Sequence, residues 1–327
     1  MILVTGANGF VGAAIARSLI ADGRETRGLV RRSSELERLE GLNPPLRYAD
    51  IGDWRALKGT LEDVETIVHC AAMASDWGSR AEFHRVNVGG VESLVEAARR
   101  SGTVRRIIHL STANVAGEGS RDAAENDVSR ERLRFDYSRS KLDAEAAAEK
   151  LCADHGIELT ILRPAAVYGP GDRKWSYRMI EAIARGRWPL VSGGRALFAP
   201  LYIDNLCRAV ALAIDREEAG GVWNITDGIA VSWREFSGMI ADHLGVNRRF
   251  RSVPYALAFP GGAMMEMVYR LPLLRGEPKL TRYRIIKAGR DFHYSIDRAR
   301  EELGYQPDTN LDGHLLKTVE WFRSLQP

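Results

Sequence analysis

Short apolar runs alternate with segments of helical periodicity along the first half of the chain. The apolar run at residues 2–4 precedes a glycine-rich turn, after which Val11, Ile15 and Leu19 recur at helical spacing. The same alternation predicts further strands at residues 26–30, 46–48, 66–70, 106–110 and 158–162, and helices at 35–40, 81–100 and 135–155. Repeated strand–helix units predict an α/β fold, in which helices cover both faces of a parallel sheet. Ligands of such sheets bind at the carboxyl ends of the strands.

The glycine-rich turn has the sequence TGANGFVG, with Gly6, Gly9 and Gly12 between the first strand and the first helix. This junction directs several backbone N–H groups and the positive end of the helix at one spot, where a pyrophosphate can bind. Glycine is needed where a Cβ would block the phosphate or the neighbouring strand. The spacing differs from the usual GxGxxG, and a tight strand–helix connection is the alternative interpretation.

The end of the second predicted strand indicates which dinucleotide would bind. Enzymes that use NAD usually have an acidic residue there, which binds the ribose hydroxyls. This chain has Arg31 and Arg32 instead, and two guanidinium groups can pair with a 2′-phosphate. We therefore predict NADP as cofactor, with NAD as the alternative, although a solvated arginine pair is also common at a strand end. Asp50 and Ile51 follow the third strand and are expected to meet the adenine or to form a turn.

Candidate catalytic groups follow the later strands. Ser111 and Thr112 end the strand at 106–110, and Tyr137 and Lys141 are four residues apart in a predicted helix, so they lie on one face. By itself, such a pair is usually an exposed helix pair. A free tyrosine, with a pKa of about 10, holds its proton too tightly to act as a base near neutrality. A neighbouring ammonium favours the phenolate and lowers that pKa.

These motifs together resemble the extended short-chain dehydrogenase/reductase family, which includes nucleotide-sugar epimerases and 3β-hydroxysteroid dehydrogenases. The matching segments are TGANGFVG at 5–12, HCAA at 69–72, Asn87 with Gly90, Thr112, Tyr137 with Lys141, LRPAAVYGPGD at 162–172, WNITDG at 223–228 and LGYQP at 303–307. The resemblance implies a Rossmann-type doubly wound sheet with a smaller C-terminal substrate-binding lobe. We expect the dinucleotide-binding domain to comprise residues 1–170 and 201–227, and the lobe 171–200 and 228–327.

The resemblance also implies roles for individual residues. Tyr137 would be the acid/base, Lys141 would lower its pKa and hold the nicotinamide ribose, and the Thr112 hydroxyl would hydrogen-bond the reacting oxygen. The expected cofactor contacts are Gly6, Asn8, Gly9, Phe10, Val11, Gly12, Arg31, Arg32, Asp50, Ile51, Ala71, Ala72, Asn87, Tyr137, Lys141, Pro164 and Val167. For Asn87, the alternative is that its side chain only satisfies buried backbone groups.

Departures from the family pattern bear on the substrate. Nucleotide-sugar members typically have an asparagine where this chain has Ala166, and an arginine and a histidine where it has Phe198 and Tyr202. The dehydratase triplet is absent, because Thr112 is followed by Ala113 and Asn114. Segments 73–78, 202–205 and 280–285 resemble the 3β-hydroxysteroid dehydrogenase branch. The expected substrate contacts are Ser75, Trp77, Ala113, Asn114, Ala166 and Tyr202.

Three functions remain open at this point. The first is an NADP(H)-dependent oxidoreductase that acts on a secondary alcohol or ketone of a hydrophobic substrate, sterol-like or a β-keto or β-hydroxy acid. The second is a nucleotide-sugar epimerase with tightly bound NAD. The third is a non-catalytic dinucleotide sensor, against which the retention of Tyr137 and Lys141 counts.

Composition narrows the choice of partners. The net charge of +3 comes from 46 basic and 43 acidic residues mixed along the 327-residue chain, which predicts no nucleic-acid partner. The three cysteines form no CxxC pair and the histidines no ligand spacing, so we expect reduced thiols, a cytoplasmic protein and no metal. No apolar run is long enough to span a membrane. The apolar stretch 255–274 is interpreted as ordinary core, with a lid or a membrane-facing surface as alternatives. A homodimer through helices 81–100 and 135–155 is expected by analogy with the family.

Overall fold

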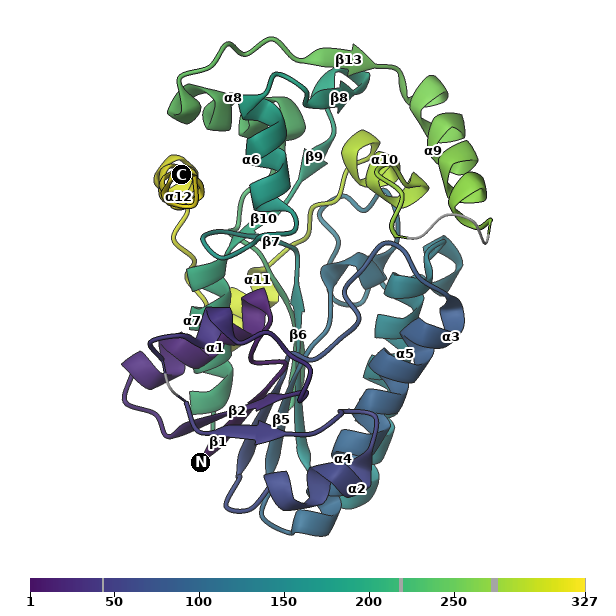
Figure 1. Ribbon diagram of the computed structural model, residues 1–327. Helices are drawn as coiled ribbons and strands as arrows, with labels where there is room; N and C mark the ends of the chain where they lie inside the picture. The colour runs from purple at the N-terminus through teal and green to yellow at the C-terminus, as the bar shows by residue number, and fades with distance from the viewer. Residues whose placement is uncertain (43, 218–219, 272–275, 327) are drawn as a thin grey trace.

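A seven-stranded parallel sheet forms the centre of the computed structural model, which describes residues 1–42, 44–217, 220–271 and 276–326. The strand order is β11-β6-β5-β4-β1-β2-β3 (Figure 1). The strands are β1 (Ile2–Thr5), β2 (Thr26–Val30), β3 (Leu46–Tyr48), β4 (Thr66–His69), β5 (Arg106–Leu110), β6 (Glu158–Pro164) and β11 (Gly221–Ile225). The predicted Rossmann-type α/β fold is confirmed.

Successive side chains of these strands enter two separate apolar layers. Leu3 and Val4 of β1 are both fully buried, but they belong to different core clusters because neighbouring residues of a strand point to opposite faces. The helices on the Val4 side are α1 (Phe10–Ala21), α7 (Ile203–Asp215) and α11 (Asp297–Leu303), and those on the Leu3 side are α2 (Trp54–Leu57), α4 (Gly89–Ser101) and α5 (Asp136–His155). Burial on both faces explains why the strands read as continuous apolar runs.

The helix expected at residues 81–100 contains an irregular turn. A short segment, α3 (Arg80–Phe83), begins with a capping box between Ser79 and Glu82, and a π-helical turn (His84–Val88) joins it to α4. π-helical turns concentrate at functional sites. Here the turn buries Asn87, one of the expected site residues.

A second layer of elements lies above the carboxyl ends of the sheet in Figure 1, and we call it the upper layer. Its two-stranded pairs are β7 (Ala166–Tyr168) with β10 (Pro200–Tyr202), β8 (Pro189–Val191) with β13 (Arg251–Val253), and β9 (Leu197–Phe198) with β12 (Val231–Ser232). Its helices are α6 (Ser176–Ala184), α8 (Trp233–Leu244), α9 (Tyr255–Tyr269), α10 (Arg282–Gly289) and α12 (Leu311–Ser324). Short 3₁₀ turns occur at Glu37–Leu39, Lys58–Thr60, Ala113–Ala116, Arg130–Arg132 and Ser192–Gly194. The chain enters this layer after β6, returns to the sheet as β11 and then enters it again.

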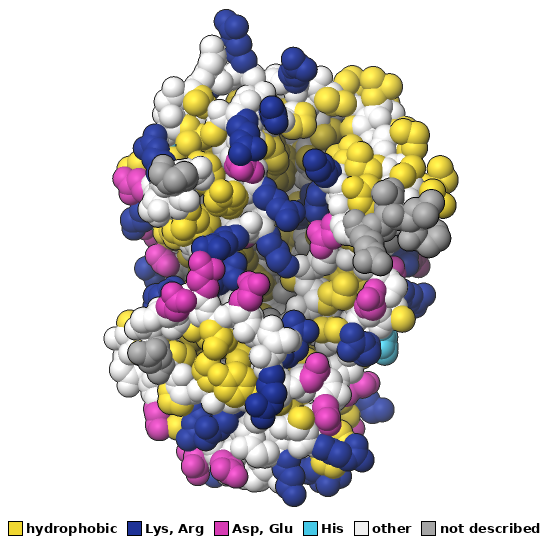
Figure 2. Space-filling model, in the orientation of Figure 1, with side chains coloured by type: hydrophobic (Ala, Val, Ile, Leu, Met, Phe, Trp, Pro, Cys, Tyr) yellow, Lys and Arg dark blue, Asp and Glu magenta, His cyan; other side chains and the backbone are white. Residues whose placement is uncertain are grey.

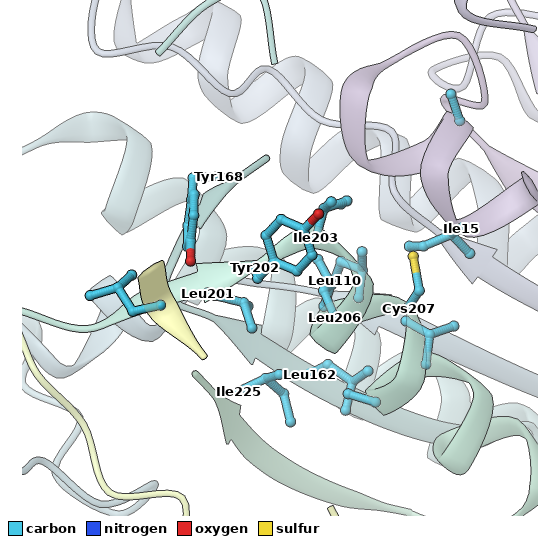
Figure 3. Packing of buried hydrophobic residues seen from close by; sticks show 14 of the residues in the cluster. Ile15, Leu110, Leu162, Tyr168, Leu201, Tyr202, Ile203, Leu206, Cys207 and Ile225 are labelled. Atoms are coloured by element: carbon cyan, nitrogen blue, oxygen red, sulfur yellow. The ribbon is translucent and has the colours of Figure 1, made fainter. Parts of the chain in front are cut away.

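One core cluster continues from the sheet into the upper layer. In Figure 3, Ile15 of α1 and Cys207 of α7 lie on one side of the view, Tyr168 lies toward the other side, and Tyr202 lies between them. The Tyr202 ring is 3% exposed and stacks on the His314 ring at 3.9 Å between centroids. The cysteines are free thiols, as predicted.

Helix α9 differs from the expected ordinary core. Its inner face buries Ala258, Gly262 and Glu266, whereas Leu257, Met264 and Met267 on the outer face are 69%, 63% and 65% exposed. The core interpretation is therefore wrong for the outer face, and residues 272–274 of this stretch lie outside the described residues. Among the described residues, no helix has the length and hydrophobicity to cross a bilayer.

Candidate active site

The glycine turn packs so closely that side chains are excluded from it. Gly6 has a φ of +63°, and a Cβ there would lie 2.9 Å from the Ala71 Cα. A Cβ on Gly12 would collide with the carbonyl oxygen of Gly6. Helix α1 begins at Phe10, and its N-cap residue, Gly9, provides no side-chain cap for the first N–H groups. The turn thus leaves backbone donors directed at the edge of the sheet, as an anion-binding helix terminus requires.

The two arginines after β2 are exposed. The Arg32 guanidinium carbon lies 5.8 Å from the centroid of the Tyr48 ring, and neither arginine forms an ion pair with a carboxylate in the described part of the chain. Asp50 accepts a hydrogen bond from the Gly52 N–H at 2.8 Å and so forms the turn that was one of its two expected roles. The arginine side chains remain available to an anion at the end of the strand.

A hydroxyl network fixes the end of β4. The Thr5 hydroxyl oxygen accepts hydrogen bonds from the Cys70 and Ala71 N–H groups, both at 3.1 Å, and lies 2.9 Å from His69 Nδ1. Because an oxygen that accepts two bonds has one proton to donate, Nδ1 is the acceptor and the His69 proton is on Nε2. Burial, helped by the charge of Lys141, lowers the pKa of His69 to about 3, so the ring is neutral.

Asn87 joins the loop after β4 to helix α5. Its Oδ1 accepts from the Met73 N–H at 2.7 Å, and its Nδ2 donates to Ser140 Oγ at 2.9 Å. Ser140 Oγ in turn donates to the Tyr137 carbonyl oxygen at 2.8 Å. The amide therefore serves the buried groups that were the alternative to cofactor binding, and it holds two walls of the site together.

Thr112, Tyr137 and Lys141 surround the end of β5. The Lys141 side chain is 3% exposed, and its Nζ donates to the Leu110 carbonyl oxygen at 2.6 Å. Burial lowers the pKa of Lys141 to about 8, although the charge of Glu145 acts in the opposite direction. Burial raises the pKa of the Tyr137 phenol to about 12, and a hydrogen bond with the Thr112 side chain opposes this rise. The predicted lowering of this pKa by Lys141 is therefore wrong for this structure, because burial dominates. At neutral pH the phenol is protonated and paired with the threonine hydroxyl.

The expected substrate residues do not all lie in one place. The Ser75 hydroxyl donates to the Trp77 carbonyl oxygen at 2.9 Å, which fixes the loop after β4. Ala113 is fully buried. Asn114 faces α10, where its side chain is hydrogen-bonded by residues of the upper layer. Tyr202 does not reach the site in this conformation, because its ring is enclosed in the core.

Two residues beyond the predicted set complete this wall. Tyr283 and Lys287 of α10 bond to the Asn114 side chain at 3.0 and 2.8 Å. Their spacing of four residues is the same signal that marks Tyr137 and Lys141 in the sequence.

Figure 2 shows Lys and Arg side chains along the hollow between the upper layer and the sheet.

A model of a known protein family matches most of this chain. The model described as "NAD dependent epimerase/dehydratase family" matches residues 2–226. The chain belongs to this family. The matched region contains the glycine turn, Thr112, Tyr137 and Lys141.

Several relatives are similar over almost their whole length. The 4-hydroxy-2-methyl-3-oxo-4-farnesyl-3,4-dihydroquinoline-1-oxide ketoreductase of Stigmatella aurantiaca is 28% identical, with 92% of this chain and 90% of the relative covered. The 2-alkyl-3-oxoalkanoate reductase of Stenotrophomonas maltophilia is 29% identical, with 95% and 96% covered. Sterol demethylase protein B of Methylococcus capsulatus is 32% identical, with 98% of both covered. These names support an enzyme of the extended dehydrogenase/reductase type and agree with the predicted 3β-hydroxysteroid dehydrogenase-like branch.

Among solved structures, the dTDP-glucose 4,6-dehydratase DesIV of Streptomyces venezuelae, with NAD and TYD bound, has a TM-score of 0.81 and 25% identity. The similarity covers 99% of this chain and 97% of that one. The family resemblance predicted from the motifs is thus confirmed, and the chain is an oxidoreductase of this family.

Proposed function

We propose that this chain is an NADP(H)-dependent oxidoreductase that transfers hydride between nicotinamide and a secondary alcohol or ketone of a hydrophobic substrate, sterol-like or a β-keto or β-hydroxy acid. The observation that carries the proposal is the Tyr137 phenol, paired with the Thr112 hydroxyl at the strand edge to which the glycine turn directs its backbone donors. The ketone-reducing and sterol-modifying relatives support the substrate class.

The residues present fit a dinucleotide. The space that a Cβ would fill at Gly6 and Gly12 and the uncapped start of α1 provide a cradle for a pyrophosphate. Arg31 and Arg32 would bind the 2′-phosphate of NADP. Asp50 and Ile51 would meet the adenine, Ala71, Ala72, Pro164 and Val167 the nicotinamide half, and Lys141 its ribose. NAD, which DesIV holds, is the alternative cofactor.

Proton transfer is the task of the side chains. When bound, the nicotinamide supplies or accepts the hydride. In the reductive direction the Tyr137 phenol gives its proton to the substrate oxygen, and the Thr112 hydroxyl stabilises the negative charge that develops there. Lys141 carries a positive charge at neutral pH, since its pKa is about 8, and this charge favours the phenolate that remains.

A nucleotide-sugar epimerase is the second candidate, because the structurally similar DesIV, a dehydratase, is an enzyme of nucleotide-sugar chemistry. Two features of this chain count against it. Phe198, which stands in place of the family's diphosphate-binding arginine, is 1% exposed and stacked on Trp233 at 4.2 Å, so the position serves the core. Ala166 cannot provide the amide that meets a sugar nucleotide. The third candidate, a cofactor sensor, would not need Tyr137.

Replacement of Tyr137 by phenylalanine tests the proposal. We expect the variant to bind NADPH normally and to reduce hydrophobic ketones about 10² to 10⁴ times more slowly, because it has lost only the proton donor. The rate of NADPH oxidation with a ketone panel measures this. Normal turnover by Tyr137→Phe would show that the acid is another group. Tightly held NAD and interconversion of sugar nucleotides would favour the epimerase.

The assembly belongs to the same proposal. We expect a cytoplasmic homodimer in which α4 and α5 of one copy pack on those of the other. Light scattering of the purified protein measures the mass directly, and a monomer at micromolar concentration would contradict the expected dimer.

A further inference from the structure

Lys287 of α10 is a partly buried lysine beside the segment that follows Thr112, and it has no acidic partner among the described residues. The Nζ of Lys287 donates to Asn114 Oδ1 at 2.8 Å and lies 3.8 Å from the centroid of the Phe292 ring. The same Oδ1 accepts a hydrogen bond from the Tyr294 hydroxyl at 3.0 Å, so both of its lone pairs are used. Across the described residues, no carboxylate forms an ion pair with Lys287 or raises its pKa, which burial lowers to about 7.

The other cations of α10 are neutralised within the protein. Arg282 pairs with Glu266 at 2.8 Å, and Arg284 pairs with Asp76 at 2.8 Å. Within the described ranges, the side-chain contacts of the Lys287 ammonium are a neutral amide and an aromatic ring. Even partial burial of an ammonium without a counter-ion is costly, and an anion supplied from outside would reduce that cost.

Side-chain contacts place this ammonium beside the reacting groups. Asn114 follows Thr112 by two residues, and its Nδ2 donates to the Tyr283 hydroxyl at 3.0 Å. The Tyr283 ring packs edge-on against Phe135, with 4.9 Å between centroids, and Phe135 immediately precedes the helix that carries Tyr137. Tyr283 and Lys287 lie on one face of α10, one turn apart. A substrate whose reacting oxygen contacts Thr112 and Tyr137 would therefore lie close to Lys287.

We propose that Lys287 binds the carboxylate of an oxo-acid or hydroxy-acid substrate and thereby selects acids over neutral ketones and alcohols. This inference rests on the proposed reductase function and narrows its substrate class. The ammonium has three N–H donors, and Asn114 accepts from only one. A carboxylate that accepts from the others forms a charge-assisted bond and supplies the missing negative charge.

The test compares an acid with its uncharged ester. We would measure oxidation of a 2-alkyl-3-hydroxyalkanoate and of its methyl ester with NADP⁺, because the hydroxy acid, unlike the β-keto acid, does not lose carbon dioxide in solution. The wild-type kcat/KM is expected to be about 10- to 100-fold higher for the acid. Lys287→Met should bring this ratio close to one, and Lys287→Arg should retain a preference. Lys317→Met, on the surface of α12, is the matched control and should keep the wild-type ratio.

A binding measurement separates this inference from the function on which it rests. Calorimetric titration with decanoate and with decanol needs no turnover, and Lys287→Met should weaken binding of the decanoate alone. If no variant oxidises any alcohol but decanoate binding still depends on Lys287, the reductase proposal fails and the carboxylate site stands. If the hydroxy acid is oxidised and Lys287→Met, folded by its circular dichroism, keeps the wild-type ratio and decanoate affinity, the carboxylate site is overturned.

Discussion

Replacement of Lys141 by methionine should stabilise the fold near neutral pH, although it removes a residue of the proposed site. Burial lowers the pKa of this lysine from 10.5 to about 8, so the folded state binds the proton less tightly than the unfolded state does. While both states are protonated, a shift of this size costs about 3 kcal/mol of the free energy of unfolding. Methionine has nearly the same length and carries no charge.

The net gain is smaller because the ammonium also makes a hydrogen bond. The Lys141 Nζ donates to the Leu110 carbonyl oxygen at 2.6 Å, and loss of that bond costs about 1–2 kcal/mol. We therefore expect the variant to be about 1–2 kcal/mol more stable than the wild type at pH 7. The charge penalty is fully present below pH 8, falls as the pH rises toward 10.5, and is then gone. Near pH 10 the loss of the hydrogen bond outweighs the relief of the charge penalty, and the wild type becomes more stable than the variant.

Urea unfolding at pH 7 and at pH 10 measures the difference in stability between Lys141→Met and the wild type, and shows whether its sign reverses. Lys150→Met, an exposed lysine on the same helix, is the control and should change the stability little at either pH. The rate of ketone reduction by Lys141→Met should be much lower than that of the wild type at both pH values. A variant less stable than the wild type at pH 7, or a difference that does not change with pH, would refute the account of this buried charge.

Three further changes test the cofactor cradle and its support. Gly12→Ala forces a Cβ against the carbonyl oxygen of the turn, and should lower the stability by about 1–3 kcal/mol and weaken NADPH binding, as measured by thermal unfolding and fluorescence titration. Replacing Arg31 and Arg32 together by alanine should lower the ratio of kcat/KM for NADPH to that for NADH at least about 10-fold, and an unchanged ratio would remove their role. Glu145→Ala leaves the guanidinium of Arg163 buried without its carboxylate, which accepts two bonds at 3.0 and 2.7 Å, and should cost about 3–5 kcal/mol in urea unfolding. A loss under 1 kcal/mol would contradict that estimate.

Local patterns predicted the sheet well. The expected strands at 26–30, 46–48 and 106–110 coincide with β2, β3 and β5, although arginines occur within them and β3 is a partly exposed edge strand. The helix that carries Tyr137 begins one residue later than expected. The π-helical turn around Asn87 was not predicted.

Contacts between distant segments could not be predicted in the same way. Asn114 and Lys287 are 173 residues apart in the chain, and their hydrogen bond depends on how the upper layer sits over β5. Tyr202 illustrates the converse, because its motif position indicated a substrate contact whereas its stacking on His314 depends on the docking of α12. For α9 the sequence left core, lid and membrane-facing surface open, and the exposure of its outer face depends on how the described elements pack.

The late return of β11 to the sheet limits how this protein can be divided. β11 pairs with β6 along five residues, although the whole first passage through the upper layer separates them in sequence. A fragment that stopped near residue 170 would keep the pairing of β6 with β5 but leave the outer edge of β6 unpaired, and such an open edge invites aggregation. Exchange of the upper layer between homologues by recombination would therefore require three matched crossover points, one after β6 and one on each side of the α7–β11 segment, rather than a single splice.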